Sequence, residues 1–428
     1  MLTLPFSKFR NTIVIISLLL FAGGIGYRLG EERVRVSVSD DSQLRIERGT
    51  EGSEPIDFSL FWDVWDRLYR YHIDRATLDP KEMFFGAIHG MVAATGDPYT
   101  TFLTPTENEG FKEDLGGEFE GIGAQLGLRD NRVIIVAPLS GTPAEKAGLL
   151  AGDMILKVDG ADTAGWAVQE AVDKIRGPRG TTVTLEIFHP QGDKPVVLSI
   201  VRGTITVPSV ESWVKNIADI TEISGLPQFP ELQTLQSRIA YLKLSRFGDN
   251  SNEEWDRAVR ELENTVRANG TLKGLILDLR NNPGGYLDGS VFIASEFLSD
   301  GVVVSQVNSD GTKEDYTVNR KGSLQAIPLV VLINEGSASA SEIVAGALKD
   351  LKRATIVGKT SFGKGSVQTP YELSGGTGLH ITTGKWLTPN GVSIHKTGVV
   401  PDFEIDNPSA PTATTDAQLA KAVEVLVQ

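Results

Sequence analysis

The arrangement of hydrophobic and polar positions changes several times along the chain. Aromatic and aliphatic side chains recur at helical spacing from Phe58 to Tyr69 and again from Phe84 to Val92, before Gly96-Asp97-Pro98-Tyr99 interrupts the pattern. The two segments predict helices. Their aromatic stripes are expected to pack in a core or between domains, and a ligand groove is the lesser alternative.

From residue 117 to residue 202, short apolar segments are separated by glycine-rich turns. This pattern is typical of short strands, and two helices are expected between them at 143–147 and 165–175. The expected strands are 121–126, 133–136, 154–158 and 183–187. The segment therefore predicts a small β-rich domain with two helices.

After Pro208, apolar strands alternate with amphipathic helical patterns. The alternation predicts an open α/β sheet whose functional loops follow the carboxyl ends of its strands. Strands are expected at 239–244, 274–279, 302–307, 329–333, 354–357 and 379–382, with a helix at 255–268. The segment 217–236, rich in Ile, Leu, Pro and Gln, is expected to be an insertion.

The N-terminus differs from the rest of the chain. Lys8 and Arg10 precede an uncharged stretch from Asn11 to Tyr27, which Arg28 closes. Basic residues before an apolar stretch are typical of an export signal. Its length lies between that of a signal-peptide core and that of a full membrane span, so an uncleaved anchor and a removable signal both stay open. The remainder is expected on the periplasmic or extracytoplasmic side of the inner membrane.

The chain is therefore expected to be an α/β multidomain protein. Six segments are expected: a signal or anchor at 1–30, a linker at 31–55, an N-terminal helical region at 56–112, the β-rich domain at 113–204, the α/β domain at 205–406, and a C-terminal tail with a short helix at 407–428.

The composition of the chain excludes several classes of function. The formal charge of −14 argues against nucleic-acid binding, which needs a basic face. The absence of cysteine removes thiolate catalysis and Cys-based zinc sites, and the five histidines have no ligand-like spacing. No metal and no cofactor are therefore expected.

The α/β region carries a first candidate loop directly after a predicted strand. Asn281-Asn282-Pro283-Gly284-Gly285 precedes a helix expected to begin near Leu287. Glycines leave backbone N–H groups free to face an anion, and a helix N-terminus adds positive potential. The loop suits an oxyanion hole, although a plain helix-entry turn has the same composition.

A second loop holds Ser337, Ser339 and Ser341 before another predicted helix. Ser339 and Glu342 have the spacing of a capping box, so the Ser339 hydroxyl has a structural alternative as a helix cap. A serine here can also be a nucleophile, with the amide of Ala340 receiving developing negative charge. The spacing does not decide which serine reacts.

A third loop holds Lys364 between two glycines, with Gln368 four residues later. Burial disfavours the charged amine and lets a lysine act as a general base, although an exposed surface lysine is the commoner case. Gln368 lies close to Lys364 only if the backbone turns helically there, since an extended chain separates them by about 13 Å. A phosphate-binding loop is excluded, because Gly365 stands where a Ser or Thr must hold magnesium.

The β-rich segment resembles a PDZ domain. The resemblance rests on the combination of Gly-Thr-Pro-Ala-Glu-Lys-Ala-Gly-Leu at 141–149, Gly-Asp-Met-Ile-Leu at 152–156 and Ile-Arg-Gly-Pro-Arg-Gly at 175–180. A strand edge after Gly121, Ile122 and Gly123 is expected to accept an extended peptide by strand addition, with backbone amides receiving its terminal carboxylate. Glycines that merely form a tight turn are the alternative.

The whole set of motifs, from Phe58 to Asp402, resembles the carboxyl-terminal processing peptidases, exported serine proteases of bacteria and plastids. This resemblance implies a protease domain related to the crotonase-like arrangement. Matched residue by residue, it implies Ser339 as nucleophile, Lys364 as general base and Gln368 as the residue that positions the lysine. The implied oxyanion donors are the amides of Ala340 and Gly285. Arg176 is the implied gating contact of the PDZ domain.

The sequence thus predicts a serine endopeptidase that cleaves proteins near their C-termini after the PDZ domain binds the tail. Its expected partners are peptides with apolar C-termini and, through the N-terminal segment, a membrane; the chain is compatible with a homo-oligomer. A non-catalytic, membrane-tethered PDZ protein is the rival from another class. A crotonase-like acyl-CoA enzyme is a third alternative, which an export signal disfavours.

Overall fold

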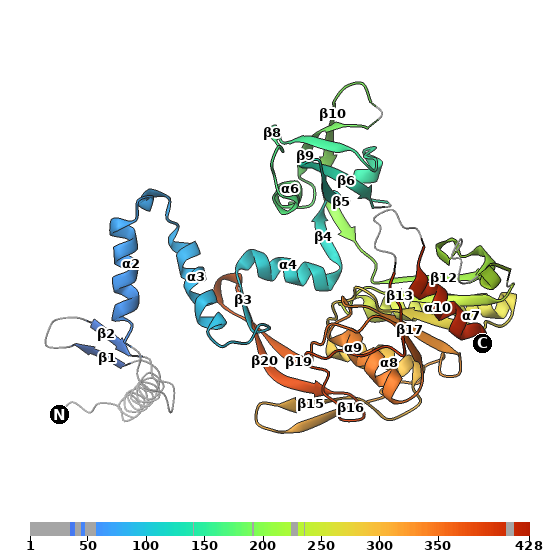
Figure 1. Ribbon diagram of the computed structural model, residues 1–428. Helices are drawn as coiled ribbons and strands as arrows, with labels where there is room; N and C mark the ends of the chain where they lie inside the picture. Colours follow the sequence, from blue (N-terminus) through green and yellow to red (C-terminus); the bar gives the residue numbers. More distant parts are fainter. Residues whose placement is uncertain are drawn as a thin grey trace, which may run out of the picture. The chain divides into compact units, whose positions relative to one another are not determined.

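The computed structural model of the chain describes residues 35–38, 44–47 and 57–428, apart from residues 140, 191, 224–229, 235 and 408–414 (Figure 1). The expected signal or anchor segment lies outside the described residues. Inside the expected linker, β1 (Arg35–Val38) pairs antiparallel with β2 (Leu44–Glu47). In the described part of the chain, no helix is both long and apolar enough to cross a membrane.

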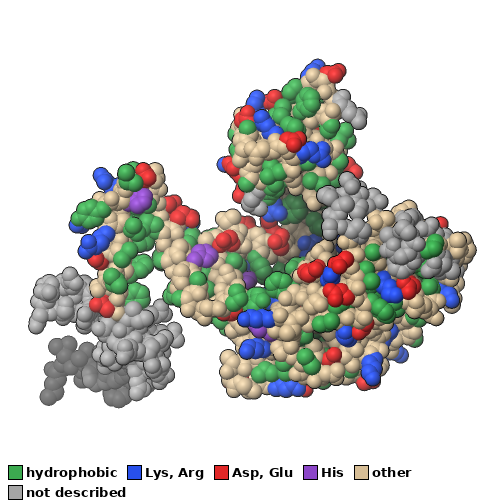
Figure 2. Space-filling model, viewed as in Figure 1, with side chains coloured by type: hydrophobic (Ala, Val, Ile, Leu, Met, Phe, Trp, Pro, Cys, Tyr) green, Lys and Arg blue, Asp and Glu red, His purple; other side chains and the backbone are tan. Residues whose placement is uncertain are grey.

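Residues up to Ile88 form one compact unit, and residues from His89 onward form a second. The first contains α2 (Ser59–Tyr71), the 3-10 turn η1 (Arg75–Thr77) and most of α3 (Pro80–Ala93). None of the residues of α2 is buried, because the described residues of its unit offer the helix little to pack against. Hydrophobic side chains accordingly lie at the surface of this unit (Figure 2).

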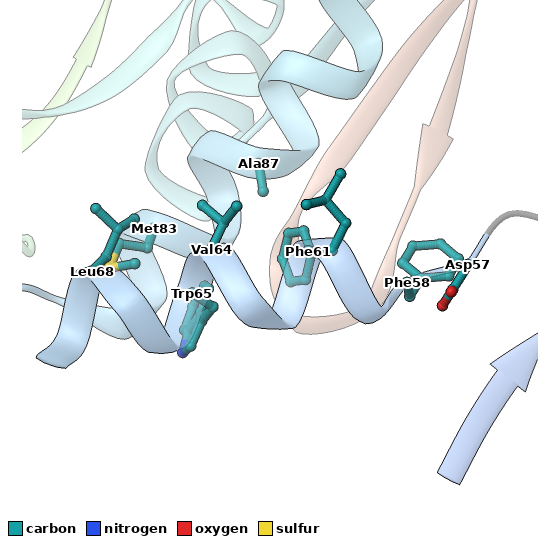
Figure 3. A pocket seen from close by; sticks show the side chains of 9 residues that line it. Asp57, Phe58, Phe61, Val64, Trp65, Leu68, Met83 and Ala87 are labelled. Carbon is teal, nitrogen blue, oxygen red and sulfur yellow. The ribbon is translucent and has the colours of Figure 1, made fainter. Parts of the chain in front are cut away.

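The aromatic stripe of α2 lines an open groove instead of a closed core (Figure 3). Leu60 is 70% exposed and Trp62 is 56% exposed. The groove has a volume of about 510 Å³ and is lined by Asp57, Phe58, Leu60, Phe61, Val64, Trp65, Leu68, Met83 and Ala87. Two helices alone cannot enclose so wide an apolar face.

The second unit contains the expected β-rich domain. Its main sheet has the strand order β10-β9-β7-β6-β5, with β8 paired to β7, so β5 lies at an edge. Alternate side chains of β9, at Val183, Leu185 and Ile187, are fully buried because successive residues of a strand face opposite sides of the sheet. Its elements are β4 (Glu118–Gly121), β5 (Ala124–Arg129), β6 (Arg132–Pro138), α5 (Pro143–Lys146), β7 (Met154–Val158), β8 (Ala161–Asp162), α6 (Val168–Ile175), β9 (Thr182–Phe188), β10 (Val196–Val201) and β11 (Gly203–Thr206).

The same unit contains the expected α/β sheet, with strand order β12-β13-β14-β17-β18-β21. The central strands β13, β14, β17 and β18 run parallel. A second sheet has the order β16-β15-β20-β19, with β3 on β20. Further elements are β3 (Thr101–Leu103), α4 (Pro105–Gly116), β12 (Val210–Asn216), η2 (Ile217–Asp219), η3 (Thr221–Ile223), η4 (Pro230–Thr234), β13 (Arg238–Leu244), α7 (Ser251–Asn269), β14 (Gly274–Asp278), α8 (Leu287–Phe297), β15 (Val302–Asn308), β16 (Lys313–Thr317), β17 (Leu329–Ile333), α9 (Ala340–Asp350), β18 (Thr355–Gly358), β19 (Ser366–Glu372), η5 (Ser374–Gly376), β20 (Gly378–Leu387), β21 (Phe403–Glu404) and α10 (Ala417–Val427).

Both faces of the parallel strands are buried, as expected when helices cover both sides of such a sheet. On β14, Leu275 and Leu277 face the core built with α7, α8 and α9, whereas Ile276 faces a second core. That second core includes α10 and Ile217, Ile220, Ile223 and Leu232 of the expected insertion. The described part of the insertion and the C-terminal helix therefore cover the sheet's other face.

Candidate active site

The three candidate loops meet because the parallel strands that precede them end at the same level. Asp278 of β14 pairs with Leu332 of β17, which pairs with Val357 of β18. The residues after these strands thus emerge at one edge of the sheet, where open α/β sheets bind their ligands.

The glycine loop lies directly against the serine loop. A Cβ atom added to Gly284 would stand 2.8 Å from the Cβ of Ser339 and 3.0 Å from the backbone nitrogen of Ala340. Gly284 also has φ +103°, and Gly285 has φ +137° with its Cβ position occupied by the backbone of Phe247. Only glycine satisfies both the conformation and the close approach.

The structure separates the three serines. Ser337 donates its hydroxyl to the carbonyl of Leu279 at 2.8 Å, and Ser341 donates its own to the carbonyl of Asn282 at 2.8 Å. Both side chains are fully buried, and these bonds tie the serine loop to the end of β14 and to the glycine loop. Ser339 is partly exposed, and its hydroxyl donates no hydrogen bond within the described residues.

Ser339 stands immediately before α9 in a strained conformation. Its backbone has φ 55° and ψ −116°, a region that costs non-glycine residues of the order of 1–3 kcal/mol. Such strain persists where surrounding contacts fix the backbone, and it is typical of nucleophiles held at a sharp strand-to-helix turn.

Glu342 fixes that turn and connects it to the lysine loop. Its fully buried carboxylate accepts the backbone N–H groups of Ser339 at 2.8 Å, Gly363 at 2.6 Å and Lys364 at 2.9 Å. It also accepts the Ser361 hydroxyl at 2.6 Å. Four donors satisfy a buried charge that would otherwise be costly.

Lys364 is partly buried. Burial lowers the pKa of Lys364 below its ordinary value, while the negative charges of Glu342 and Asp97 act in the opposite direction. Its Nζ lies 5.5 Å from the centroid of the Tyr99 ring. Within the described residues, no hydrogen bond joins this amine to the Ser339 hydroxyl.

Gln368 lies on β19, in extended backbone, and not in a helical turn. Its amide nitrogen donates to the hydroxyls of Ser366 at 2.9 Å and Thr382 at 3.3 Å. A contact with Lys364 therefore depends on side-chain rearrangement, and the role of Gln368 stays a prediction.

Two backbone N–H groups of the neighbouring glycine and serine loops have no acceptor among the described residues. Among the described residues, no hydrogen bond uses the amide of Gly285 or that of Ala340. Ala340 is also the first residue of α9, where the helix dipole adds positive potential. The pair has the composition that an oxyanion hole requires.

The candidate peptide-binding turn leads into the edge strand β5. Gly123 has φ 77°, and a Cβ added there would overlap the Thr142 side chain. The carbonyls of Ile122 and Gly123 accept Ala144 and Leu139 amides at 2.8 Å and 2.9 Å, which fixes the turn. Gly121 ends β4 and pairs with Gly203.

Arg176 follows α6 and makes two contacts with the segment 113–119. Its guanidinium pairs with Glu113 of α4 at 2.9 Å and lies 4.6 Å from the centroid of the Phe119 ring. Burial raises the pKa of Glu113, and the Arg176 charge opposes that rise.

Sequence reasoning missed several supporting residues. It treated Glu342 only as a helix cap, and it gave Tyr99 no role beside Lys364. It also missed a buried cluster in which Arg280 pairs with Asp278 and with Asp416 at the start of α10. The contacts of Glu342 and Tyr99 with Lys364, and of Arg280 with Asp416, join residues far apart in the sequence, and local spacing carries no signal for them.

Comparison with known proteins agrees with this geometry. Residues 238–405 match the family described as Peptidase family S41, and residues 108–188 match the PDZ domain. A carboxyl-terminal-processing protease of Synechocystis is 37% identical over 85% of this chain and 81% of its own length. A carboxy-terminal-processing protease of Bartonella bacilliformis is 36% identical over 81% of this chain and 75% of its own length.

A solved structure also shares the fold. The crystal structure of an S41 protease from Bacteroides fragilis superposes with a TM-score of 0.52 at 17% identity, covering 89% of this chain and 99% of that one. The predicted PDZ domain, α/β peptidase domain and hydrolase activity are confirmed. The chain belongs to the S41 peptidase family, among the carboxyl-terminal processing proteases, and is a serine-type peptidase with a PDZ domain.

Proposed function

We propose that this peptidase is an exported Ser-Lys endopeptidase that cleaves proteins near their C-termini. One observation carries the proposal: the buried Glu342 carboxylate links the backbone of Ser339 to that of Lys364, whose pKa burial lowers. The other two serines of the loop hold structural hydrogen bonds. Ser339 is therefore assigned as the nucleophile and Lys364 as the general base.

In the first half of the reaction, the neutral amine of Lys364 takes the proton of the Ser339 hydroxyl as its oxygen attacks the substrate carbonyl. The amides of Gly285 and Ala340 stabilise the resulting oxyanion. The C–N bond then breaks, and Lys364 returns the proton to the leaving amine.

In the second half, water attacks the acyl-enzyme with Lys364 again as the base, and the Ser339 hydroxyl is restored. We assign Gln368 to orient the Lys364 amine during these transfers. In this role the side-chain oxygen of Gln368 accepts from the Lys364 amine, while its amide nitrogen donates to Ser366.

We propose that the PDZ domain selects substrates by their C-terminal tails. The edge position of β5 supports addition of an extended peptide strand, and the amides around Gly121, Ile122 and Gly123 are assigned to its carboxylate.

Arg176 is the proposed gating residue, because its contacts with Glu113 and Phe119 connect the end of α6 to α4. Replacement by alanine removes both contacts. We expect Arg176→Ala to change the ratio of cleavage rates for tailed and tailless peptides, and an unchanged ratio would refute this role.

The cellular setting completes the proposal. The charge pattern of residues 8–28 supports export, with the enzyme on the outer face of the inner membrane and tethered if the segment is retained. The exposed apolar groove of α2 and α3 supports assembly into a homo-oligomer, since such faces favour burial against a partner (Figure 3).

The test uses the full chain and a peptide with an apolar C-terminus, followed by mass spectrometry. The wild type is expected to release an internal cleavage product, whereas Ser339→Ala and Lys364→Ala are expected to release none while keeping the wild-type melting temperature or nearly so. C-terminal amidation of the peptide is expected to weaken cleavage. Full activity of Ser339→Ala would refute the assignment.

A further inference from the structure

The motif Gly96-Asp97-Pro98-Tyr99-Thr100 places Tyr99 beside Lys364, although more than 260 residues separate the motif from Lys364 along the chain. The strand after it, β3, adds to the peptidase's second sheet, where Thr101 pairs with His380 of β20. Strand pairing therefore fixes where the motif enters the site. The mechanism above gives the motif no role.

Asp97 is held in a network that leads to Gln368. Its carboxylate accepts the Thr100 hydroxyl at 2.6 Å and the Tyr99 amide at 3.1 Å, and Thr382 also bonds to it. The Thr382 hydroxyl in turn accepts the Gln368 amide at 3.3 Å. The local turn and β20 thus hold the Asp97 carboxylate in place.

The Tyr99 ring lies close to the Lys364 amine. The Lys364 ammonium lies 5.5 Å from the Tyr99 ring centroid, within the range where an aromatic ring attracts a cation. The ring of His395 packs edge-on against Tyr99 at 6.2 Å and supports its orientation. A ring attracts the charged amine and not the neutral one, so Tyr99 discriminates between the two protonation states of Lys364.

We propose that Asp97 and Tyr99 are positioning residues that hold the Lys364 amine in its charged form before the reaction. The amine must leave this position and lose its proton before it acts as the base. The proposal rests on the proposed role of Lys364 as general base. The Asp97-Pro98-Tyr99 segment then influences the protonation of Lys364, in addition to its structural role in the fold.

The other charged and titratable groups around Lys364 set the background for this role. Glu342, from α9, favours the charged amine, as Asp97 does from the turn before β3. His380, on β20, has its pKa lowered by burial and then by the Lys364 charge, so it is neutral at the pH values where a lysine base operates. Asp97 and Glu342 are therefore the acidic side chains whose removal favours the neutral amine.

The test measures the pKa of Lys364 directly, in the full-length Ser339→Ala protein, from the pH dependence of Lys364 acetylation by acetic anhydride, read by peptide mass spectrometry. Asp97→Asn keeps an acceptor for the Thr100 hydroxyl but removes the charge. We expect it to lower the apparent pKa by about one unit, the scale of one nearby charge. Tyr99→Leu is expected to lower it as well, and Tyr99→Phe to leave it unchanged.

A matched control exists on the same unit. Asp310 also accepts the hydroxyl and amide of a nearby threonine, Thr312, but among the described residues none of its hydrogen bonds reaches the Lys364 loop. Asp310→Asn is expected to leave the Lys364 pKa unchanged. Equal pKa values in wild type, Asp97→Asn and Tyr99→Leu would overturn the proposal.

A kinetic readout on the Ser339-containing enzyme separates this proposal from the proposed function. The acidic limb of kcat/KM is expected to move to lower pH by about one unit in Asp97→Asn, because kcat/KM reports groups of the free enzyme. A shifted acetylation profile without proteolysis in the wild type would refute the proposed function and support the positioning role. Proteolysis by the wild type with no shift in either profile would support the proposed function and refute the positioning role.

Discussion

The carboxylate of Glu342 accepts the backbone N–H of Lys364 at 2.9 Å. The same oxygen accepts the backbone N–H of Ser339 at 2.8 Å. A single buried side chain thus sets the separation of the loops that carry the proposed nucleophile and base. Its negative charge also favours the charged form of Lys364, in opposition to burial.

Replacing Glu342 by glutamine is expected to disrupt this link. The NH2 group of the new glutamine would face backbone N–H donors. Each buried donor left without an acceptor lowers the free energy of unfolding by about 1–3 kcal/mol. A displacement of the loops by about 1 Å is enough to lower kcat/KM roughly 100-fold. Enzyme kinetics and thermal denaturation measure the two effects.

Glu335→Gln is the matched control, because Glu335 lies in the same serine loop but is exposed. It is expected to change neither kcat/KM nor the melting temperature. Wild-type activity and stability in Glu342→Gln would contradict the linking role.

Ser337→Ala and Ser341→Ala are expected to affect stability and to spare the nucleophile. Ser337→Ala removes the bond to the Leu279 carbonyl and the bond accepted from the Asn334 amide, and Ser341→Ala removes the bond to the Asn282 carbonyl. Each lost bond is expected to cost about 1 kcal/mol of unfolding free energy. Urea denaturation measures this loss, and residual peptide cleavage reports the nucleophile. If Ser341→Ala abolishes cleavage in a folded protein, the assignment of Ser339 is wrong.

Gly284→Ala is expected to displace the oxyanion loop. The added Cβ would meet Ser339 and the backbone of Ala340 in a conformation with φ +103°. Loss of one oxyanion donor lowers kcat about 100- to 1,000-fold. Gly311→Ala isolates the conformational cost, since Gly311 has φ +82° but no atom within 4 Å of the added Cβ. Equal activity of the two variants would argue against the close approach.

Lys364→Met is expected to stabilise the fold at neutral pH. The pKa of Lys364 is lowered in the folded state from an ordinary value of 10.5, so the unfolded chain binds more protons between the two values. The penalty of burying the charge is complete below the folded pKa and disappears as pH rises toward 10.5. Melting curves of both proteins should converge at high pH. A difference in melting temperature that stays constant across this pH range would contradict the lowered pKa of Lys364.

Local patterns were enough to predict the parallel strands and the loops after them. Leu275 to Leu277 is apolar on both faces, as a strand between two helical layers must be. The same strand ends placed the Gly285, Ser339 and Lys364 loops at one edge. The rule that ligands bind beyond the carboxyl ends of parallel strands therefore predicts where the site lies.

The roles within the site depended on contacts that sequence spacing does not encode. Ser337 and Ser341 differ from Ser339 because their hydroxyls bond to the carbonyls of Leu279 and Asn282, 58 and 59 residues away. Glu342 reaches Lys364 across 22 residues. The extended backbone at Gln368 reflects pairing of β19 with β20, which overrides the local preference of the loop.

Labelling with a fluorophosphonate, followed by peptide mass spectrometry, tests the Ser339–Lys364 pair most directly. The reagent phosphonylates an activated serine, so the wild-type adduct is expected on Ser339. The labelling rate is expected to fall at least about 100-fold in Lys364→Ala, the scale of general-base catalysis. An adduct on Ser337 or Ser341, or equal labelling rates with and without Lys364, would contradict the account.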